Sequence, residues 1–180
     1  GIVKSRINMR EVALPFMQEL HEKIGEAINL GARHEDEIVY LERTSSGRAL
    51  VRVVYLVGGR APLHLTSLGK LFLAADDPQK IREYAKRTGL PGKTPHSLTT
   101  LAALEKELDK VRRHGIAYDD EEAELGLKCV AAPIHDDEGN IVAALSVSAP
   151  ADRHDPDWAR QVKQTADAVS KTLGYTGAKK

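Results

Sequence analysis

The feature that most restricts the fold is the order in which strand-like and helix-like segments follow one another along the chain. Short segments rich in Ile, Val and Tyr, separated by polar or glycine-containing turns, predict strands. Longer segments whose apolar residues recur every three or four positions predict amphipathic helices. The order is helix, strands, helices, strands, helix, which predicts an α+β domain with one central antiparallel sheet flanked by helices. The predicted strands cover residues 27–32, 37–43, 50–57, 61–65, 116–121, 128–135 and 141–148.

Residues that favour helix ends mark the limits of the predicted helices. Thr66 stands at an N-cap position before a helix that begins at Ser67. Further helices are predicted over 78–87, over 99–113 and from Pro156 onward. Gly115 follows the basic residues that end the 99–113 helix, and it predicts a left-handed cap there.

Pro15 interrupts an apolar stripe that predicts an N-terminal helix. A proline inside a helix removes a backbone hydrogen bond and kinks the axis. The residues before Pro15 are therefore expected to belong to a separate helix.

Composition excludes several classes of protein. With 42% apolar and 29% charged residues in 180, the chain predicts one soluble globular domain. Lys plus Arg equals Asp plus Glu at 26 each, so this chain alone is expected to bind DNA poorly. One cysteine allows no internal disulfide, the start has no pattern of a secretion signal, and no apolar run reaches the roughly 18 residues of a membrane span. The predicted location is the cytoplasm, with no membrane partner.

Ser146 and Ser148 are two apart in a predicted strand and therefore share a face with the small Ala144. Their hydroxyls can donate hydrogen bonds to an anion. A solvent-exposed strand face is the alternative. The first amides of the helix at Ser67 add a second set of donors, since they lack partners within the helix, although most helix ends meet only water or a cap.

Asp119 and Cys129 each leave alternatives open. Asp119 lies in an acidic run that is typical of a solvated edge, but it can also accept from a ligand hydroxyl or hold a proton if burial raises its pKa. Cys129 fits a small buried apolar residue or a nucleophile. The seven histidines show no triad or metal-ligand spacing, and the sequence has no phosphate-binding or dinucleotide motif. No catalytic residue, metal ligand or cofactor is predicted.

Several segments resemble the effector-binding half of the IclR family of bacterial transcriptional regulators. The matching stretches are Gly115 to Glu122, Leu125 to Ile134, Pro62 to His64, Ser67 to Lys70 and Ala143 to Pro150, in the order of that family. The resemblance implies a GAF-like (profilin-like) fold. It also implies that residues 1–14 are the end of a linker helix and 15–180 an effector-binding and oligomerisation domain, with the winged helix-turn-helix that binds DNA outside this chain.

In related sensors of small 2-oxo acids the ligand is held by two backbone amides, which correspond to Ser67 and Leu68. The resemblance further implies ligand contacts from the side chains of Asp119, Cys129, Ser146 and Ser148, and apolar walls from Leu50, Val53 and Ala61. This sequence has Ser67-Leu68 where those sensors carry small residues such as Gly-Ala, which would reshape the cup. The implied effector is a small organic acid, of the 2-oxo acid, sugar acid or aromatic acid type, and the implied assembly is a homodimer or tetramer.

Two other functions compete with this interpretation. The first is an enzyme in which Cys129 attacks a substrate with Asp119 or a histidine as base. The second is a structural oligomerisation module with no physiological ligand, its pocket vestigial or holding a metal. The residues favour a non-catalytic sensor.

Overall fold

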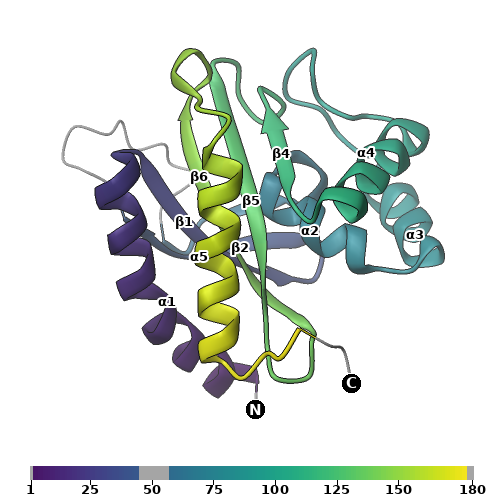
Figure 1. Ribbon diagram of the computed structural model, residues 1–180. Helices are drawn as coiled ribbons and strands as arrows, with labels where there is room; N and C mark the ends of the chain where they lie inside the picture. Colours follow the sequence, from purple (N-terminus) through teal and green to yellow (C-terminus); the bar gives the residue numbers. More distant parts are fainter. Residues whose placement is uncertain (1, 45–56, 178–180) are drawn as a thin grey trace.

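The computed structural model describes the backbone of residues 2–44 and 57–177, and the side chains from Met9 onward within those ranges. A six-stranded antiparallel sheet with the strand order β3-β2-β1-β6-β5-β4 runs through the middle of the molecule, with helices on both sides (Figure 1). The predicted α+β architecture is confirmed. The strands are β1 Ala27–His34, β2 Glu37–Thr44, β3 Arg60–Pro62, β4 Ala117–Asp120, β5 Leu127–His135 and β6 Ile141–Pro150.

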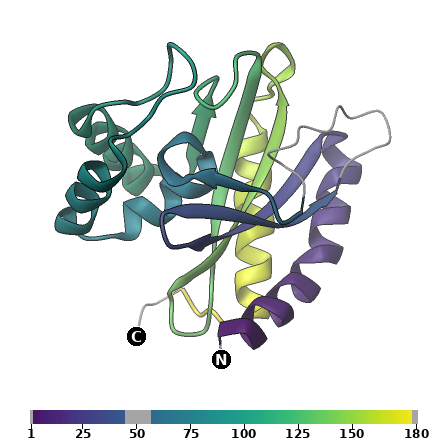
Figure 2. The same ribbon diagram turned by 180° about the vertical axis from the view of Figure 1, so that it is seen from behind.

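The helices divide between the two faces of this sheet. The long α1 (Ile2–Ile24) and α5 (Trp158–Thr172) lie side by side on one face, and α2 (Ser67–Ala75) packs on the other (Figures 1 and 2). Beyond α2 lie α3 (Pro78–Thr88) and α4 (Leu101–His114), and the short 3-10 helices η2 (Leu63–Leu65) and η3 (Ala151–Arg153) complete the described elements. No helix in residues 2–44 and 57–177 is both long enough and apolar enough to cross a membrane.

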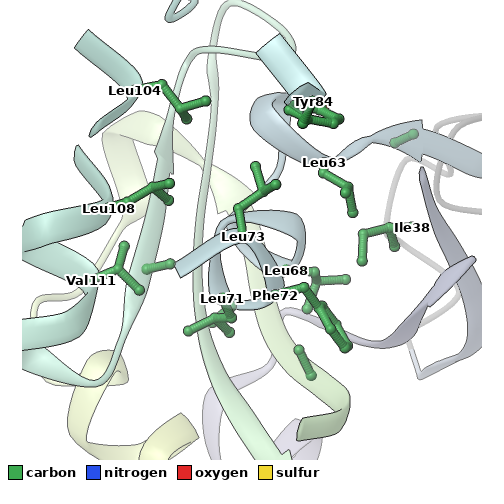
Figure 3. Close-up of a cluster of buried hydrophobic side chains, with 14 of the residues drawn as sticks. Ile38, Leu63, Leu68, Leu71, Phe72, Leu73, Tyr84, Leu104, Leu108 and Val111 are labelled. Carbon is green, nitrogen blue, oxygen red and sulfur yellow. The ribbon is translucent and has the colours of Figure 1, made fainter. Parts of the chain in front are cut away.

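Two apolar cores result, one on each face, because consecutive side chains of a strand point to opposite sides. On β6, Leu145 and Val147 pack with α1 and α5, whereas Ala144 faces α2. Figure 3 shows the α2 core, where Leu68, Leu71 and Phe72 pack against the sheet and Leu104, Leu108 and Val111 of α4 close the far side.

The predicted helix ends are confirmed at two positions. The Thr66 hydroxyl accepts a hydrogen bond from the amide of Gly69 over 2.8 Å, as expected of an N-cap. Gly115 ends α4 with φ 71°, a left-handed conformation that glycine adopts without steric strain.

The predicted strand over 61–65 is wrong beyond Pro62. There β3 ends, and Leu63–Leu65 forms a 3-10 turn whose three side chains are buried. A Cβ added to Gly69 would lie 2.1 Å from the carbonyl oxygen of Leu63, so this turn and α2 pack backbone to backbone. Pro62 has no N–H with which to continue a ladder. The predicted strand over 50–57 lies outside the described residues except for Val57, which is in a turn.

Helix α1 runs through Pro15 without interruption, so the expected separate helix before this proline is wrong. Pro15 is on the exposed side of α1, while Ala13 and Met17 on either side of it are fully buried against the apolar core. The tertiary packing of these neighbours holds the helix together where one backbone hydrogen bond is missing. The boundary between residues 1–14 and 15–180 stays a prediction.

Candidate functional site

Four neighbouring strands bring the predicted polar residues onto one face of the sheet. The register places Asp119 of β4 opposite Cys129 of β5, and Cys129 opposite Ser148 of β6. On the other side of β6, Ser146 is opposite Asn29 of β1. These five residues, Asn29, Asp119, Cys129, Ser146 and Ser148, form what we call the polar cluster, and their face is the one that packs against α2.

Hydrogen bonds join the members of the polar cluster from β1 and β6. The Asn29 side-chain amide donates to Ser148 Oγ over 2.8 Å and to Ser146 Oγ over 3.2 Å. Cys129 Sγ lies 3.3 Å from Ser148 Oγ. Ser146 and Ser148 are 2% and 5% exposed, so the alternative of a solvated strand face is wrong.

Asp119 is the acidic member of the polar cluster, and only 1% of it is exposed. Its Oδ1 accepts from the amides of Glu122 at 2.8 Å and Ala123 at 3.3 Å. Burial raises the pKa of Asp119 to about 7, against the lowering effect of the hydrogen bond from the Glu122 amide. The carboxyl group therefore holds a proton for part of the time near neutral pH, and the interpretation of Asp119 as a solvated edge residue is wrong.

Lys70 of α2 ties this helix to the end of β4. Its side chain is fully buried, and its Nζ donates to Glu107 Oε2 and to the carbonyl of Tyr118, both over 2.6 Å. The same ammonium lies 2.8 Å from Glu122 Oε1. Because the amide of Glu122 also holds Asp119, this ion pair connects α2 to the acidic side of the polar cluster.

The first turn of α2 lies over β1. Ser67 and Leu68 are 2% and 1% exposed, and a Cβ added to Gly31 would come within 2.9 Å of Leu68 Cδ1. Gly31 is two residues from Asn29 and so on the same face. The glycine lets the leucine approach the strand, which places the helix start above the polar cluster.

A cavity of about 220 Å³ opens beside the polar cluster. Tyr40 lines this cavity and lies close to the polar cluster. Burial, together with the neighbouring Cys129 and Asp119, raises the pKa of its hydroxyl. Of the predicted apolar walls, Ala61 lines this cavity, while Leu50 and Val53 lie outside the described residues. The cavity is also lined by Pro62, Leu65, Thr66, Lys93, Ala123 and Glu124.

A larger groove, of about 440 Å³, runs along the edge strand β4 between α4 and the segment that follows η3, where His154 and Pro156 line it. None of the predicted site residues that the structure describes lines it, so its size does not make it the site that the sequence indicates. Within residues 2–44 and 57–177 no group of three or more His, Cys, Asp or Glu side chains is placed to hold a metal ion.

Sequence reasoning missed Asn29, Tyr40, Arg43 and Lys70. One signal was available for Asn29, because it is the only polar side chain in the apolar segment Ala27 to Ala32. Arg43 Nη1 donates to Asn29 Oδ1 over 3.3 Å, a contact between strands that no local pattern predicts.

Comparison with known proteins assigns the class that fits this fold and this buried site. Residues 2–171 match the family described as "Bacterial transcriptional regulator IclR C-terminal", which makes the chain an effector-binding domain of a bacterial transcriptional regulator. The chain belongs to the IclR family.

Individual relatives agree with this assignment. The transcriptional repressor AllR of Klebsiella pneumoniae is 35% identical over 164 residues, which are 89% of this chain and 60% of AllR. This chain thus spans about three fifths of that repressor. An IclR homologue of Microbacterium hydrocarbonoxydans complexed with 4-hydroxybenzoate superposes with a TM-score of 0.87 at 28% identity, covering 93% of this chain and 69% of the homologue. AllR is named as a transcriptional repressor, in agreement with the predicted non-catalytic domain.

The inducer-binding domain of PobR from Acinetobacter, as a double mutant in complex with 3-hydroxybenzoic acid, has a TM-score of 0.80 at 28% identity. The alignment covers 91% of this chain and 96% of that domain. Two structural neighbours of this chain therefore contain small aromatic acids.

Proposed function

We propose that this domain binds a small organic acid on the polar cluster and passes its occupancy to a winged helix-turn-helix in an N-terminal part of the protein. The observation that carries the proposal is the pair of serine hydroxyls on one strand face, buried together with Asn29, Cys129 and Asp119. Burying these polar groups costs free energy unless each is hydrogen-bonded, and the cluster places such groups on a sheet face that is otherwise apolar.

The carboxylate of the effector would accept hydrogen bonds from Ser146, Ser148 and the first amides of α2. Ser67 and Leu68 supply those amides at the positive end of the helix. Asp119 would accept from a ligand hydroxyl when ionised or donate when protonated, and its raised pKa makes both forms available near neutral pH. Cys129 adds a polarisable side of the cup, and Leu50, Val53 and Ala61 would supply its apolar walls.

The two relatives that contain hydroxybenzoates support an aromatic acid as one candidate class, beside 2-oxo acids and sugar acids. Leu68 narrows the choice, because its side chain already occupies the space above Gly31. A ligand that fits here reaches the cluster from the side of Tyr40 and Ala61, where the 220 Å³ cavity lies.

The remaining parts of the proposal concern the whole protein. The domain would form a homodimer or tetramer, with residues 1–14 as the end of a linker helix, and would bind DNA only through the N-terminal domain, in the cytoplasm. Light scattering of the isolated chain tests the assembly, and a mass near that of a 19.7 kDa monomer would contradict it.

The decisive experiment is thermal unfolding with a panel of glyoxylate, pyruvate, sugar acids and benzoates. A true effector at 100 times its dissociation constant adds about 2.7 kcal/mol to the free energy of unfolding. The matched variant is Ser148→Ala, which should change the free energy of unfolding of the unliganded protein by only about 1 kcal/mol and lose most of the ligand-induced shift. If no carboxylate shifts the melting temperature of the folded protein, the proposal is wrong.

A further inference from the structure

A chain of hydrogen bonds crosses three strands beneath the proposed site. Arg43 of β2 is opposite Asn29 of β1, and Asn29 is opposite Ser146 of β6. Arg43 Nη1 donates to Asn29 Oδ1, and Asn29 Nδ2 donates to both serine hydroxyls. Figure 2 shows β1 between its two neighbours on the side from which α2 covers the sheet.

The chemistry of the groups determines which atom donates and which accepts in this series of hydrogen bonds. A guanidinium carries only donors and stays charged at any physiological pH, so the Asn29 atom that faces Arg43 must be the oxygen. The amide nitrogen then faces the serines, and it has hydrogens to donate but no lone pair with which to accept. Each serine oxygen must therefore accept from Asn29.

A hydroxyl that accepts in this way keeps its own hydrogen for another partner. Ser146 and Ser148 thus have hydrogens to offer on the face covered by α2. The thiol of Cys129, 3.3 Å from Ser148 Oγ, is a weak donor and a weak acceptor, so it competes poorly with an anion for the Ser148 hydrogen.

We propose that Arg43 and Asn29 determine effector specificity by orienting the serine hydroxyls as donors, so that the cup selects groups that only accept. This inference rests on the proposed function and refines its ligand class. The group that contacts the serines is a carboxylate, and the carboxamide, which has the same shape but replaces one accepting oxygen by an N–H donor group, is rejected. A site that must leave its own polar groups unpaired discriminates strongly against such an analogue.

The Asn29→Asp variant reverses the direction of the hydrogen bonds to the serines with almost no change of shape. Both oxygens of the introduced carboxylate accept only, so the serines must donate to it and have no hydrogen left for the ligand. Arg43 still has an acceptor at the same place, which supports folding of the variant.

The test measures dissociation constants of matched acid and amide pairs, pyruvate with pyruvamide and 4-hydroxybenzoate with 4-hydroxybenzamide, by calorimetry. The wild-type protein should bind the acid of one pair at least 100-fold more tightly than the amide. Asn29→Asp should reduce this acid-to-amide ratio at least 100-fold. Arg43→Met, at a half-buried position that tolerates change more easily, allows the Asn29 amide to turn over and should reduce the ratio about tenfold.

A merely structural Asn29 would weaken the acid and the amide by the same factor. Asn29→Asp and Arg43→Met also change the charge beside the anion, so Arg43→Gln is the matched control: it loses the same charge as Arg43→Met but keeps an N–H donor for Asn29 Oδ1. It should retain most of the wild-type ratio, and a loss as large as that of Arg43→Met would overturn the inference. Arg43→Lys, which keeps a cationic donor, should restore most of the wild-type ratio. If the wild-type protein binds an acid and both Asn29→Asp and Arg43→Met keep its ratio, this inference is overturned and the proposed function stands. If the wild-type protein binds neither member of any carboxylate pair, the proposed function falls and the inference with it.

Discussion

The two faces of the sheet differ sharply, although the same strands supply both. Toward α1 and α5 the buried side chains of β1, β5 and β6 are apolar, with Ile28, Val130 and Leu145 as examples. Toward α2 the adjacent residue on each of these strands belongs to the polar cluster: Asn29, Cys129 and Ser146. One face is built for packing, while the other exchanges part of its apolar contact for hydrogen-bonding groups that a ligand can use.

Residues that stabilise the fold and residues available for ligand recognition are therefore adjacent in each strand and point to opposite faces of the sheet. Apolar burial supplies most of the free energy of folding, whereas a satisfied buried hydrogen bond contributes only about 1 kcal/mol. Substitutions on the α1/α5 face should therefore change stability and spare ligand binding, and substitutions in the polar cluster should do the reverse. Four substitutions put this separation to the test.

The largest effect on stability is expected from Lys70→Met. Lys70 belongs to α2, so this substitution tests whether a residue on the polar side of the sheet can also contribute strongly to stability. Removing the ammonium leaves the carboxylate of Glu122, only 6% exposed, without its countercharge. Breaking a buried pair in this way lowers the free energy of unfolding by about 3–5 kcal/mol. Urea denaturation measures it. Glu107→Gln is the control, since Glu107 is more exposed and glutamine still accepts from Lys70; a loss as large as that of Lys70→Met would show that Glu122 is not the critical partner.

Leu145→Ala probes the apolar face at a fully buried position between α5 and the sheet. The cavity it leaves should lower the free energy of unfolding by about 2–5 kcal/mol. Ligand affinity, measured by calorimetry well below the melting temperature, should stay within about twofold of wild type, because the side chain points away from the polar cluster. A large loss of affinity in a folded Leu145→Ala protein would contradict the separation of the two faces.

Asp119→Asn tests the acidic side of the cluster through pH. The folded-state pKa of Asp119 is raised to about 7 from 3.8, so the stability that its proton confers is complete below pH 3.8 and is lost as the pH rises through about 7. Over this window the wild-type protein should lose up to about 1.4 kcal/mol per pH unit relative to Asp119→Asn. Asparagine keeps an oxygen that can accept from the amides of Glu122 and Ala123. Denaturation of both proteins at pH 5, 6, 7 and 8 gives the difference, and a constant difference would show that Asp119 does not titrate there.

The smallest change in stability is expected for Ser146→Ala. The substitution removes one hydroxyl that accepts from Asn29 over 3.2 Å, while the same amide keeps its shorter bond to Ser148. The free energy of unfolding should change by less than about 1 kcal/mol. Effector affinity should fall at least tenfold. A protein that binds the effector as tightly as wild type would remove Ser146 from the site.

Local sequence patterns predicted most of the elements, because helix caps, turns and side-chain alternation depend on residues close together in the chain. The cap at Thr66, the end of α4 at Gly115 and the common face of Ser146 and Ser148 are of this kind. The resemblance to the IclR family added Asp119 and Cys129 to the predicted site. The strand register places Cys129 opposite Ser148 and Asp119 opposite Cys129.

Contacts between distant segments set which residues meet across the sheet, and no local pattern predicts them. The bond from Asn29 to Ser148 joins residues 119 positions apart, and the salt bridge from Lys70 to Glu122 connects a helix to a loop after a different strand. Packing also decided that α1 continues through Pro15 and that the chain leaves β3 for a 3-10 turn at Leu63. The α+β class and the alternation that divides polar from apolar faces follow from the sequence alone. The site follows from the strand order, because pairing between distant strands is set by the burial of whole faces and not by any segment alone.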